Sequence, residues 1–428
     1  MHNTTDTKCL APWMSIHHWP DGNVYPCCLW DSGDPVGNLN EQPLEEIWNA
    51  PKLKDARLKM LNGEKVKSCD RCYKLEGTGD SSYRQRINKE HSQYENYLRQ
   101  TNEDGSLDFM NFHLWDLRIS NFCNFKCRSC GAGLSSSWHK DAIELGLVSK
   151  DSKALININD KTNFLKQIEN HYSCVDEIYF AGGEPLIMPE HYTILDELIK
   201  RDKTDVAIRY STNFSKLTFK NKHIFEYWKK FNNLELFISI DGIGKIGEYV
   251  RSGYNDNEFG KNVEAFKQSG IKFKHYGYAV TYGTLNYLHL FDLILDFISR
   301  DFIDSTKPEP GNRTVFFSPI TYPTHYDCKF LPQRFKNQFK KRLDAFEKEL
   351  EERGTDKDFN RDIIHKLNTV YNTSISGKYS YDEMQTCKEY TDKLDSMRKE
   401  SLKEVFPYFN SSLDFITTTV EDEINKVI

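Results

Sequence analysis

The middle of the chain alternates between two hydrophobic patterns. Short apolar runs of strand length are followed by segments whose apolar residues recur with a helical period, and turn residues separate them. This repeated alternation favours parallel strands joined by right-handed crossovers. The predicted strands are residues 113–120, 177–181, 206–211, 234–240, 272–280 and 315–319.

Helices are predicted between these strands. Six strand–helix units suit a partial (β/α)6 barrel better than a complete barrel of eight units, so the predicted fold class is α/β. In a barrel of this kind the reactive groups lie at the C-terminal ends of the strands. The clearest predicted helices are residues 192–201, 222–231, 260–269 and 287–303.

The flanking regions follow other patterns. Two strand-like runs, 13–19 and 23–26, flank the turn Pro20-Asp21-Gly22 and predict a β-hairpin. Helical segments are predicted at 44–48 and 51–61, and the end of the chain lacks strand patterning. The expected domains are a cysteine-rich domain (1–80), a linker with some helix (81–108), the barrel (109–323) and a helical C-terminal region (324–428).

Composition narrows the class of protein. The 428 residues are 38% apolar and carry a net charge of −6, so no overall positive field favours nucleic acid as a partner. The polar N-terminus lacks a signal peptide and no apolar run approaches the ~18 residues of a membrane span. A cytoplasmic location is therefore expected. In that compartment, eleven cysteines indicate metal or redox chemistry rather than a disulfide framework.

One group of cysteines directly follows the first predicted barrel strand. Cys123, Cys127 and Cys130 lie on a single short loop. A four-iron cluster has four ligand positions, so three thiolates leave one iron open for a substrate or cofactor. Zinc prefers four nitrogen or sulfur ligands, and His113 or His139 could complete such a set. Spacing alone leaves both the cluster and the zinc site open.

A second motif gives the cysteine loop a context. Residues 179–185, Tyr-Phe-Ala-Gly-Gly-Glu-Pro, end the second predicted strand. Together with the Cys-x3-Cys-x2-Cys loop, this order resembles the radical S-adenosylmethionine (SAM) superfamily over about residues 115–285. The resemblance implies that SAM chelates the open iron of a [4Fe–4S] cluster, and that Gly182, Gly183 and Glu184 hold its amino group. One departure is Ser129, where many members have an aromatic residue near the adenine; Phe125 or another side chain could take that contact.

Further residues at strand ends are similar to the family's cofactor contacts. The third and fourth predicted strands end in Ser-Thr-Asn and Ser-Ile-Asp-Gly, and a later arginine could pair with the SAM carboxylate. Asp-Gly after a strand is also a common turn. The expected cofactor-binding residues from these segments are Ser211, Asn213, Ser239, Asp241 and Arg251. Asp241 and Cys328 are the candidate catalytic residues.

A second set of cysteines lies near the N-terminus. Cys9 and Cys27 stand in a Cys-x12-Gly-x4-Cys pattern, and Cys69 and Cys72 form a Cys-x2-Cys pair. A hairpin turned at Gly22 would bring Cys9 and Cys27 together, and the Cys-x2-Cys turn would close the site. The pattern resembles the auxiliary-cluster modules called twitch or SPASM domains, which implies one fully ligated auxiliary [4Fe–4S] cluster; a zinc ribbon is the rival from spacing alone. In most members considered, this module follows the barrel, whereas here it precedes it.

The resemblance implies a radical mechanism. A reduced cluster would cleave SAM to methionine and a 5′-deoxyadenosyl radical, which abstracts hydrogen from a substrate, with an electron donor such as flavodoxin or ferredoxin. An auxiliary cluster would suit a net oxidation. The preferred substrate is a peptide or protein side chain, and the alternative is dehydrogenation of a small alcohol or amino sugar. A non-catalytic zinc-binding adaptor is the alternative from another class.

Overall fold

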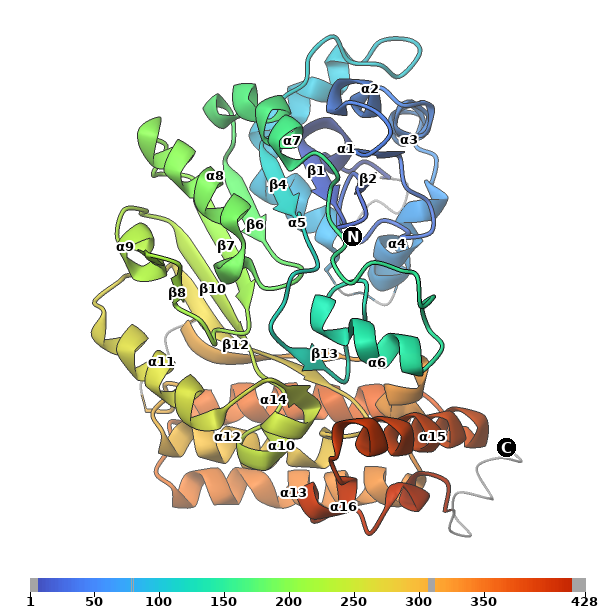
Figure 1. Ribbon diagram of the computed structural model, residues 1–428, viewed down its shortest axis with the longest axis vertical. Helices are drawn as coiled ribbons and strands as arrows, with labels where there is room; N and C mark the ends of the chain where they lie inside the picture. Colours follow the sequence, from blue (N-terminus) through green and yellow to red (C-terminus); the bar gives the residue numbers. More distant parts are fainter. Residues whose placement is uncertain (1–6, 78, 80, 307–311, 418–428) are drawn as a thin grey trace. The chain divides into compact units, whose positions relative to one another are not determined.

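The computed structural model describes residues 7–77, 79, 81–306 and 312–417 (Figure 1). It divides the chain into two compact units, each built from segments that are distant in the sequence. The first unit comprises Met1–Phe122, Leu155–Ser211 and Thr218–Leu234, and the second comprises Cys123–Ala154, Thr212–Leu217 and Glu235–Ile428.

The sheet of the first unit joins the N-terminal hairpin to barrel strands. The predicted hairpin forms, because β1 and β2 pair antiparallel. Unexpectedly, β1 also pairs parallel with β4, placing His17 opposite Asp116, so the hairpin continues the parallel sheet. In order across this part of the sheet, the strands are β7 (Ala207–Thr212), β6 (Glu177–Phe180), β4 (Leu114–Leu117), β1 (Ser15–His18), β2 (Asn23–Tyr25) and β3 (Gly37–Asn38).

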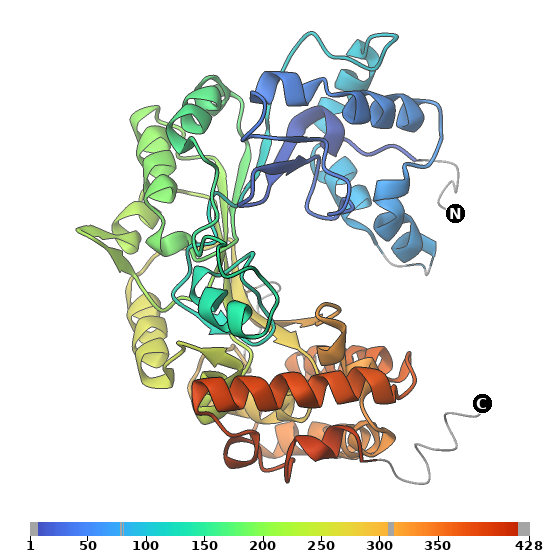
Figure 2. The ribbon, with the colours of Figure 1, turned by 45° about the vertical axis from the view of Figure 1, so that its right-hand side comes forward.

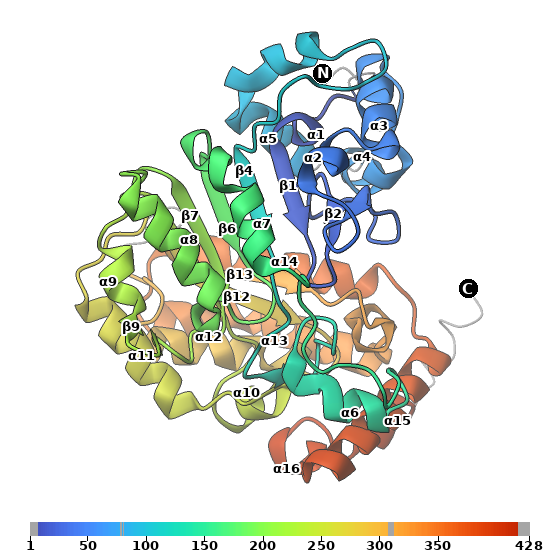
Figure 3. The same ribbon diagram turned by 45° about the horizontal axis from the view of Figure 1, so that its top comes forward.

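The two faces of this sheet differ in polarity. Trp115, Ile178 and Ile208 alternate with polar residues and are fully buried on one face. Helix α8 (Pro189–Lys200) covers this face, where the ring of its His191 lies 2.9 Å from the Tyr210 hydroxyl (Figures 1 and 3). The opposite face carries charged and polar side chains.

Short helices complete the first unit. The predicted helices at 44–48 and 51–61 are confirmed with unchanged bounds as α2 and α3. The predicted helix at 222–231 is shorter, since its first two residues pair as strand β9 (Lys222–His223) with β8 (Thr218–Phe219). The other α-helices are α1 (Ala11–Met14), α4 (Asp70–Gly77), α5 (Tyr83–Glu90), α7 (Lys161–Gln167) and α9 (Ile224–Trp228).

The second unit supplies the remaining parallel strands. Strands β10 (Leu234–Ser239), β12 (His275–Tyr282) and β13 (Asn312–Pro319) pair parallel in that order. A short antiparallel ladder joins β5 (Lys126–Cys127) to β11 (Arg251–Ser252). The predicted α/β class of partial-barrel type is therefore confirmed. The helices near these strands are α6 (His139–Glu144), α10 (Gly244–Val250), α11 (Asp256–Gln268) and α12 (Leu290–Ser299).

The C-terminal region is helical, as predicted. Phe339 of α13 stacks on Tyr371 of α14, and these helices, orange in Figure 2, lie side by side. Within the described part of the chain, no helix is long and apolar enough to cross a membrane. The C-terminal helices are α13 (Gln333–Glu352), α14 (Lys357–Ile375), α15 (Tyr381–Arg398) and α16 (Leu402–Val405).

Candidate functional site

The three-cysteine loop of the second unit is shaped by its own backbone. Cys127 lies in β5 directly opposite Arg251 in β11. The Cys130 N–H donates to the Cys127 carbonyl at 3.0 Å, and the Phe125 N–H donates to the Cys123 sulfur at 3.4 Å. Such N–H···S contacts stabilise negative charge on sulfur and help to set the potential of a bound cluster.

Side chains outside the loop fix its position. Trp138 Nε1 donates to the Cys127 carbonyl at 2.7 Å, and the Ser137 hydroxyl donates to the Cys123 carbonyl at 2.7 Å. Gly253 has φ +109°, and a Cβ there would lie 2.8 Å from the Phe125 ring. Only glycine permits this approach, so Phe125 is buried against the backbone of β11 and the residue that follows it.

Arg251 and Asp241, two predicted cofactor residues, form a buried ion pair beside these cysteines. Arg251 Nη1 donates to Asp241 Oδ2 at 2.8 Å, and the Thr281 N–H donates to Asp241 Oδ1 at 2.8 Å. Burial opposes the charge on Arg251, but Cys127 and Asp241 outweigh burial and raise its pKa. A permanent positive charge therefore lies next to the cysteine loop.

Asn213 connects the end of β7 to the same loop. Its amide donates to Asn124 Oδ1 at 3.0 Å, and Asn124 in turn donates to the Ser215 hydroxyl at 2.9 Å. Asn124 lies between the first two cysteines and carries no motif, so the sequence did not single it out. The hydrogen bonds connect two strand-end segments that are about ninety residues apart.

A small pocket adjoins this loop within the second unit. Ser129 lines it, so the position that departs from the family pattern faces open space rather than a packed ring. Apolar side chains provide one part of the lining, and polar groups provide the rest. The other lining residues are Arg128, Asp241, Val250, Thr281, Leu285, Asn286, Ile320 and Tyr326.

The Gly-Gly-Glu turn lies in the first unit. Gly182 and Gly183 have φ +72° and +54°, and a Cβ on Gly183 would lie 2.5 Å from the Phe122 carbonyl oxygen. The Glu184 N–H donates to that same carbonyl at 2.8 Å, and its carboxylate accepts from the Leu186 N–H at 3.0 Å. Phe122 is the last residue of the first unit before Cys123 in the chain.

The N-terminal cysteines also meet within the first unit. Cys9, Cys27, Cys69 and Cys72 all line one pocket. Burial raises the pKa of Cys9 to about 12, and the charge of Cys72 adds to the increase. The four thiols therefore lie around one space, and their role as the four ligands of one cluster stays a prediction.

Comparison with known families decides what these sites hold. Residues 117–291 match the radical SAM superfamily, and residues 9–73 match SPASM, an iron–sulfur cluster-binding domain. The chain therefore contains a radical SAM domain preceded by an iron–sulfur cluster-binding domain. Its cofactors are SAM and a [4Fe–4S] cluster, with an auxiliary iron–sulfur cluster in the N-terminal domain. These matches favour iron–sulfur clusters over zinc at both cysteine sites.

Two solved structures are similar to parts of the chain. The chain is 17% identical to anSMEcpe, solved with AdoMet and a peptide; the match covers 54% of this chain and 60% of that one, with a TM-score of 0.36. It is 13% identical to SuiB of Streptococcus suis, solved with SAM; that match covers 84% and 70% of the two chains, also with a TM-score of 0.36. No curated protein matches the chain.

The donor sets fit the clusters of a radical SAM enzyme. Burial raises the pKa of Cys127 to about 12, with Arg251 opposing the increase, so loading the cluster must displace a thiol proton. Among the described residues, no three Cys, His, Asp or Glu side chains converge on the position of a single ion. A [4Fe–4S] cluster binds each thiolate through a different iron, so its ligands stand further apart than those of one ion.

Replacing Gly183 of the radical SAM domain with alanine is expected to damage the Gly-Gly-Glu turn. The new Cβ would meet two backbone carbonyl oxygens at 2.5 and 2.8 Å, at a φ that alanine rarely adopts. We expect a loss of about 2–3 kcal/mol in the free energy of unfolding and a higher KM for SAM.

Gly146→Ala is the matched control for this substitution. Gly146 has a similar φ of +73°, but nothing lies within 4 Å of an added Cβ. Urea unfolding should show a clearly smaller loss for Gly146→Ala, and its KM for SAM should not change. Equal losses in the two variants would contradict a role for close packing at Gly183.

Three further residues were predicted for the site, and each lies in a different element of the fold. The Ser211 hydroxyl lies 2.7 Å from the Tyr179 hydroxyl in the first unit, and Ser239 is the half-buried last residue of β10. Cys328 is buried at the start of a short 3-10 helix, and burial raises the pKa of its thiol to about 12. Their predicted roles stay predictions.

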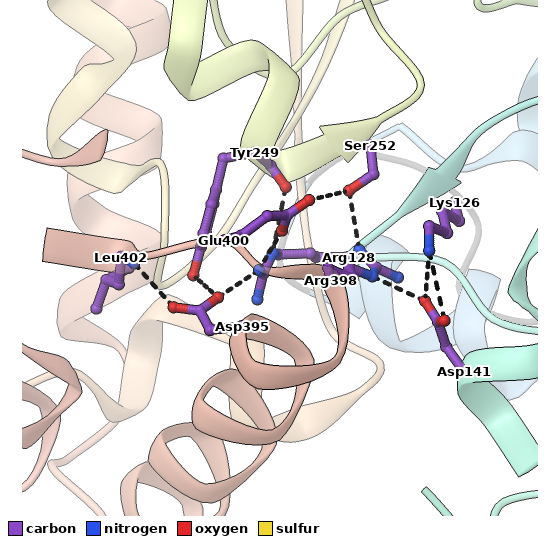
Figure 4. A network of polar contacts seen from close by, with 9 residues as sticks. All are labelled: Lys126, Arg128, Asp141, Tyr249, Ser252, Asp395, Arg398, Glu400 and Leu402. Atoms are coloured by element: carbon purple, nitrogen blue, oxygen red, sulfur yellow. Dashed lines mark hydrogen bonds and ion pairs between the residues drawn. The ribbon is translucent and has the colours of Figure 1, made fainter. Parts of the chain in front are cut away.

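No sequence pattern predicted that the C-terminal region contacts the cysteine loop, yet the structure has such a contact (Figure 4). Arg128 lies between two cysteines and is 1% exposed; its Nη2 contacts carboxylate oxygens of Asp395 and Glu400, each at 2.5 Å. Its guanidinium also stacks on Tyr249, 3.7 Å from the ring centroid. A residue of the cysteine loop is thus held by side chains about 270 residues later in the chain.

A second contact reinforces the first (Figure 4). Arg398, the last residue of α15, donates to Asp141 Oδ2 at 2.8 Å, and Lys126 contacts the same oxygen at 3.1 Å. Lys126 precedes Cys127 directly. The end of α15 therefore holds the cysteine loop of the radical SAM domain from both sides of Cys127.

Proposed function

We propose that this enzyme cleaves SAM reductively at the Cys123–Cys127–Cys130 cluster and oxidises a peptide or protein side chain. The observation that carries the first part is the cysteine loop paired to Arg251, with Asp241 beside it. The domain boundaries and site residues predicted from the sequence are retained as part of this proposal.

The chain's own residues would orient SAM. Arg251 Nε is buried and finds no acceptor among the described residues, so a carboxylate of SAM would satisfy it. Both oxygens of Asp241 already accept hydrogen bonds, which favours a role in holding Arg251 over a role as a base. The cavity lined by Ser129, Val250 and Asn286 would receive the adenine.

Cys123, Cys127 and Cys130 would hold the cluster, which, once reduced by an external donor such as flavodoxin or ferredoxin, would supply the one electron needed to cleave SAM into methionine and a 5′-deoxyadenosyl radical. The protein's contribution is to orient SAM and to exclude solvent and competing hydrogen donors. The SPASM match supports an auxiliary electron acceptor for a net oxidation.

Anaerobic reconstitution followed by reduction tests this function. We expect about eight iron and eight sulfide per chain and 5′-deoxyadenosine that forms only with reductant. With a substrate peptide deuterated at the target side chain, deuterium should appear in 5′-deoxyadenosine, and the peptide should lose two hydrogens. Zinc without sulfide, or 5′-deoxyadenosine without any reductant dependence, would contradict the proposal.

A further inference from the structure

The polar face of the first unit's sheet carries Arg118, whose guanidinium, in the part of the chain that the structure describes, donates a hydrogen bond through its Nε only. Side chains alternate along a strand, and paired residues point to the same face. His17 pairs with Asp116 and Asp116 pairs with Tyr179, so these three side chains share the polar face. Two residues further along the strands, Trp19 and Arg118 belong to the same face.

Neighbouring groups fix the orientation of Arg118. Its Nε donates to Asp116 Oδ1 at 3.2 Å, and the other oxygen of Asp116 lies 2.9 Å from His17 Nδ1. Burial favours the neutral form of Asp116, but Arg118 and His17 outweigh it and lower the pKa of Asp116 to about 2. The guanidinium lies 4.5 Å from the centroid of the Trp19 ring. The arginine is therefore preorganised by an ion pair and a ring.

The position of Arg118 connects two predicted cofactor segments of the first unit. Its aliphatic chain packs on Gly182 of the Gly-Gly-Glu turn, where an added Cβ would lie 2.8 Å from the Arg118 Cβ. Arg118 also interacts electrostatically with Cys28, which follows the predicted cluster ligand Cys27. Trp19 belongs to the SPASM segment. A molecule at Arg118 would thus contact both segments.

The two η-nitrogens of the Arg118 guanidinium take no part in the contacts described above. The side chain of Arg118 is 16% exposed. Within the described residues, no hydrogen-bond acceptor is found for either of its η-nitrogens. Two parallel N–H donors with one positive charge match a carboxylate, which they bind through two hydrogen bonds. A phosphate dianion would need more positive charge than this site offers, because Asp116 already offsets part of it.

We propose that Arg118 anchors a carboxylate of the substrate, such as an acidic side chain of the peptide. This inference rests on the proposed function, because it names a chemical class for the substrate of that reaction. Asp116 and His17 are positioning residues. Asp116 accepts a hydrogen bond from Arg118, and His17 contacts the other carboxylate oxygen of Asp116.

Binding of small model compounds to the reconstituted, unreduced holoenzyme tests the anchor. The probes are N-acetyl-glutamate N-methylamide and the corresponding glutamine compound, which has the same shape but no charge. By saturation-transfer NMR, the wild-type protein should bind the glutamate compound about ten-fold more tightly or better. Arg118→Gln should remove this preference, and Arg118→Lys should keep only part of it.

Arg201→Gln is the matched control. Arg201 lies in the same unit and also stacks on an aromatic ring, Tyr172, but it pairs with Glu169 and Glu197 at the end of α8. Its loss should leave the preference for glutamate unchanged. Circular dichroism and iron content of each variant show whether the fold and the clusters are intact.

Two results would overturn the anchor. One is a wild-type protein without preference for the glutamate compound, or an Arg118→Gln variant that keeps the preference. The other is an Arg118→Gln variant that loses affinity for SAM while its preference for glutamate persists, because Arg118 would then hold the SAM carboxylate. These binding assays use no reductant, so failure of SAM cleavage in the wild-type protein would count against the proposed function and not against the anchor.

Discussion

Cys123→Ala is expected to lower the formation of 5′-deoxyadenosine to the level of enzyme-free controls. In the function proposed above, Cys123 supplies one of the three thiolates of the open cluster, and alanine cannot replace a thiolate ligand. The iron content should fall from about eight to about four per chain, because the auxiliary cluster has its own four cysteines. The measurements are quantification of 5′-deoxyadenosine under dithionite and iron analysis of the same samples.

Cys174→Ala provides the control for this loss. The Cys174 sulfur contacts the His171 carbonyl at 3.3 Å in the first unit, and the residue has no part in either cysteine site. Iron content and 5′-deoxyadenosine formation should match the wild-type protein. If the Cys123 variant still cleaves SAM, the three-cysteine loop does not hold the catalytic cluster.

Arg128→Met is expected to produce the largest structural effect outside the cysteines. The substitution keeps the apolar stem but leaves Asp395 and Glu400 without their cation. Removing one partner of a buried ion pair costs about 3–5 kcal/mol. Because the side chains of Asp395 and Glu400 retain 16% and 23% exposure, we expect a smaller loss, of about 2–4 kcal/mol, in the free energy of unfolding.

The cluster loop should respond to the same substitution. With its contact to the end of α15 lost, the loop should bind iron less firmly, so iron should be lost faster to a chelator. Combining Arg128→Met with Asp395→Asn and Glu400→Gln should recover part of the stability, since no unpaired carboxylate then remains. Lys348→Met is the control, because its pair with Glu352 is exposed and should contribute less than about 0.5 kcal/mol.

A triple variant that is no more stable than Arg128→Met would show that unpaired charge is not the cause. Iron loss at the wild-type rate in Arg128→Met would show that α15 does not support the cluster loop. The first measurement concerns the free energy of unfolding and the second concerns the loop, so the two conclusions are independent.

Local sequence patterns predicted a helix with the correct bounds where a residue at or next to the end of the helix marks that end. Helices at 44–48 and 51–61 have their predicted bounds, since Pro43 and Pro51 mark their first turns. The helix expected from 260 begins instead at Asp256, because Asn255 caps it through the Glu258 N–H. Element type followed from periodicity, whereas several ends depended on single side-chain hydrogen bonds.

The pairing of β1 with β4 was not predictable in this way. Alternating residues predict that two strands form a hairpin, but they do not show whether a further strand pairs with the edge of that hairpin. Only the packed sheet places His17 beside Asp116 and thereby orients Arg118. No spacing rule connects these residues, which lie in two separate segments of the sequence.

The sequence by itself determined the chemistry of this protein. Fixed spacings of cysteine and glycine are a local property, because a short loop can hold a cluster only if its ligands recur at those intervals. The tertiary structure alone decided which distant groups support that chemistry. Arg128 meets Asp395 and Glu400 because α15 packs beside the loop, and such ion pairs leave no periodic trace in the sequence.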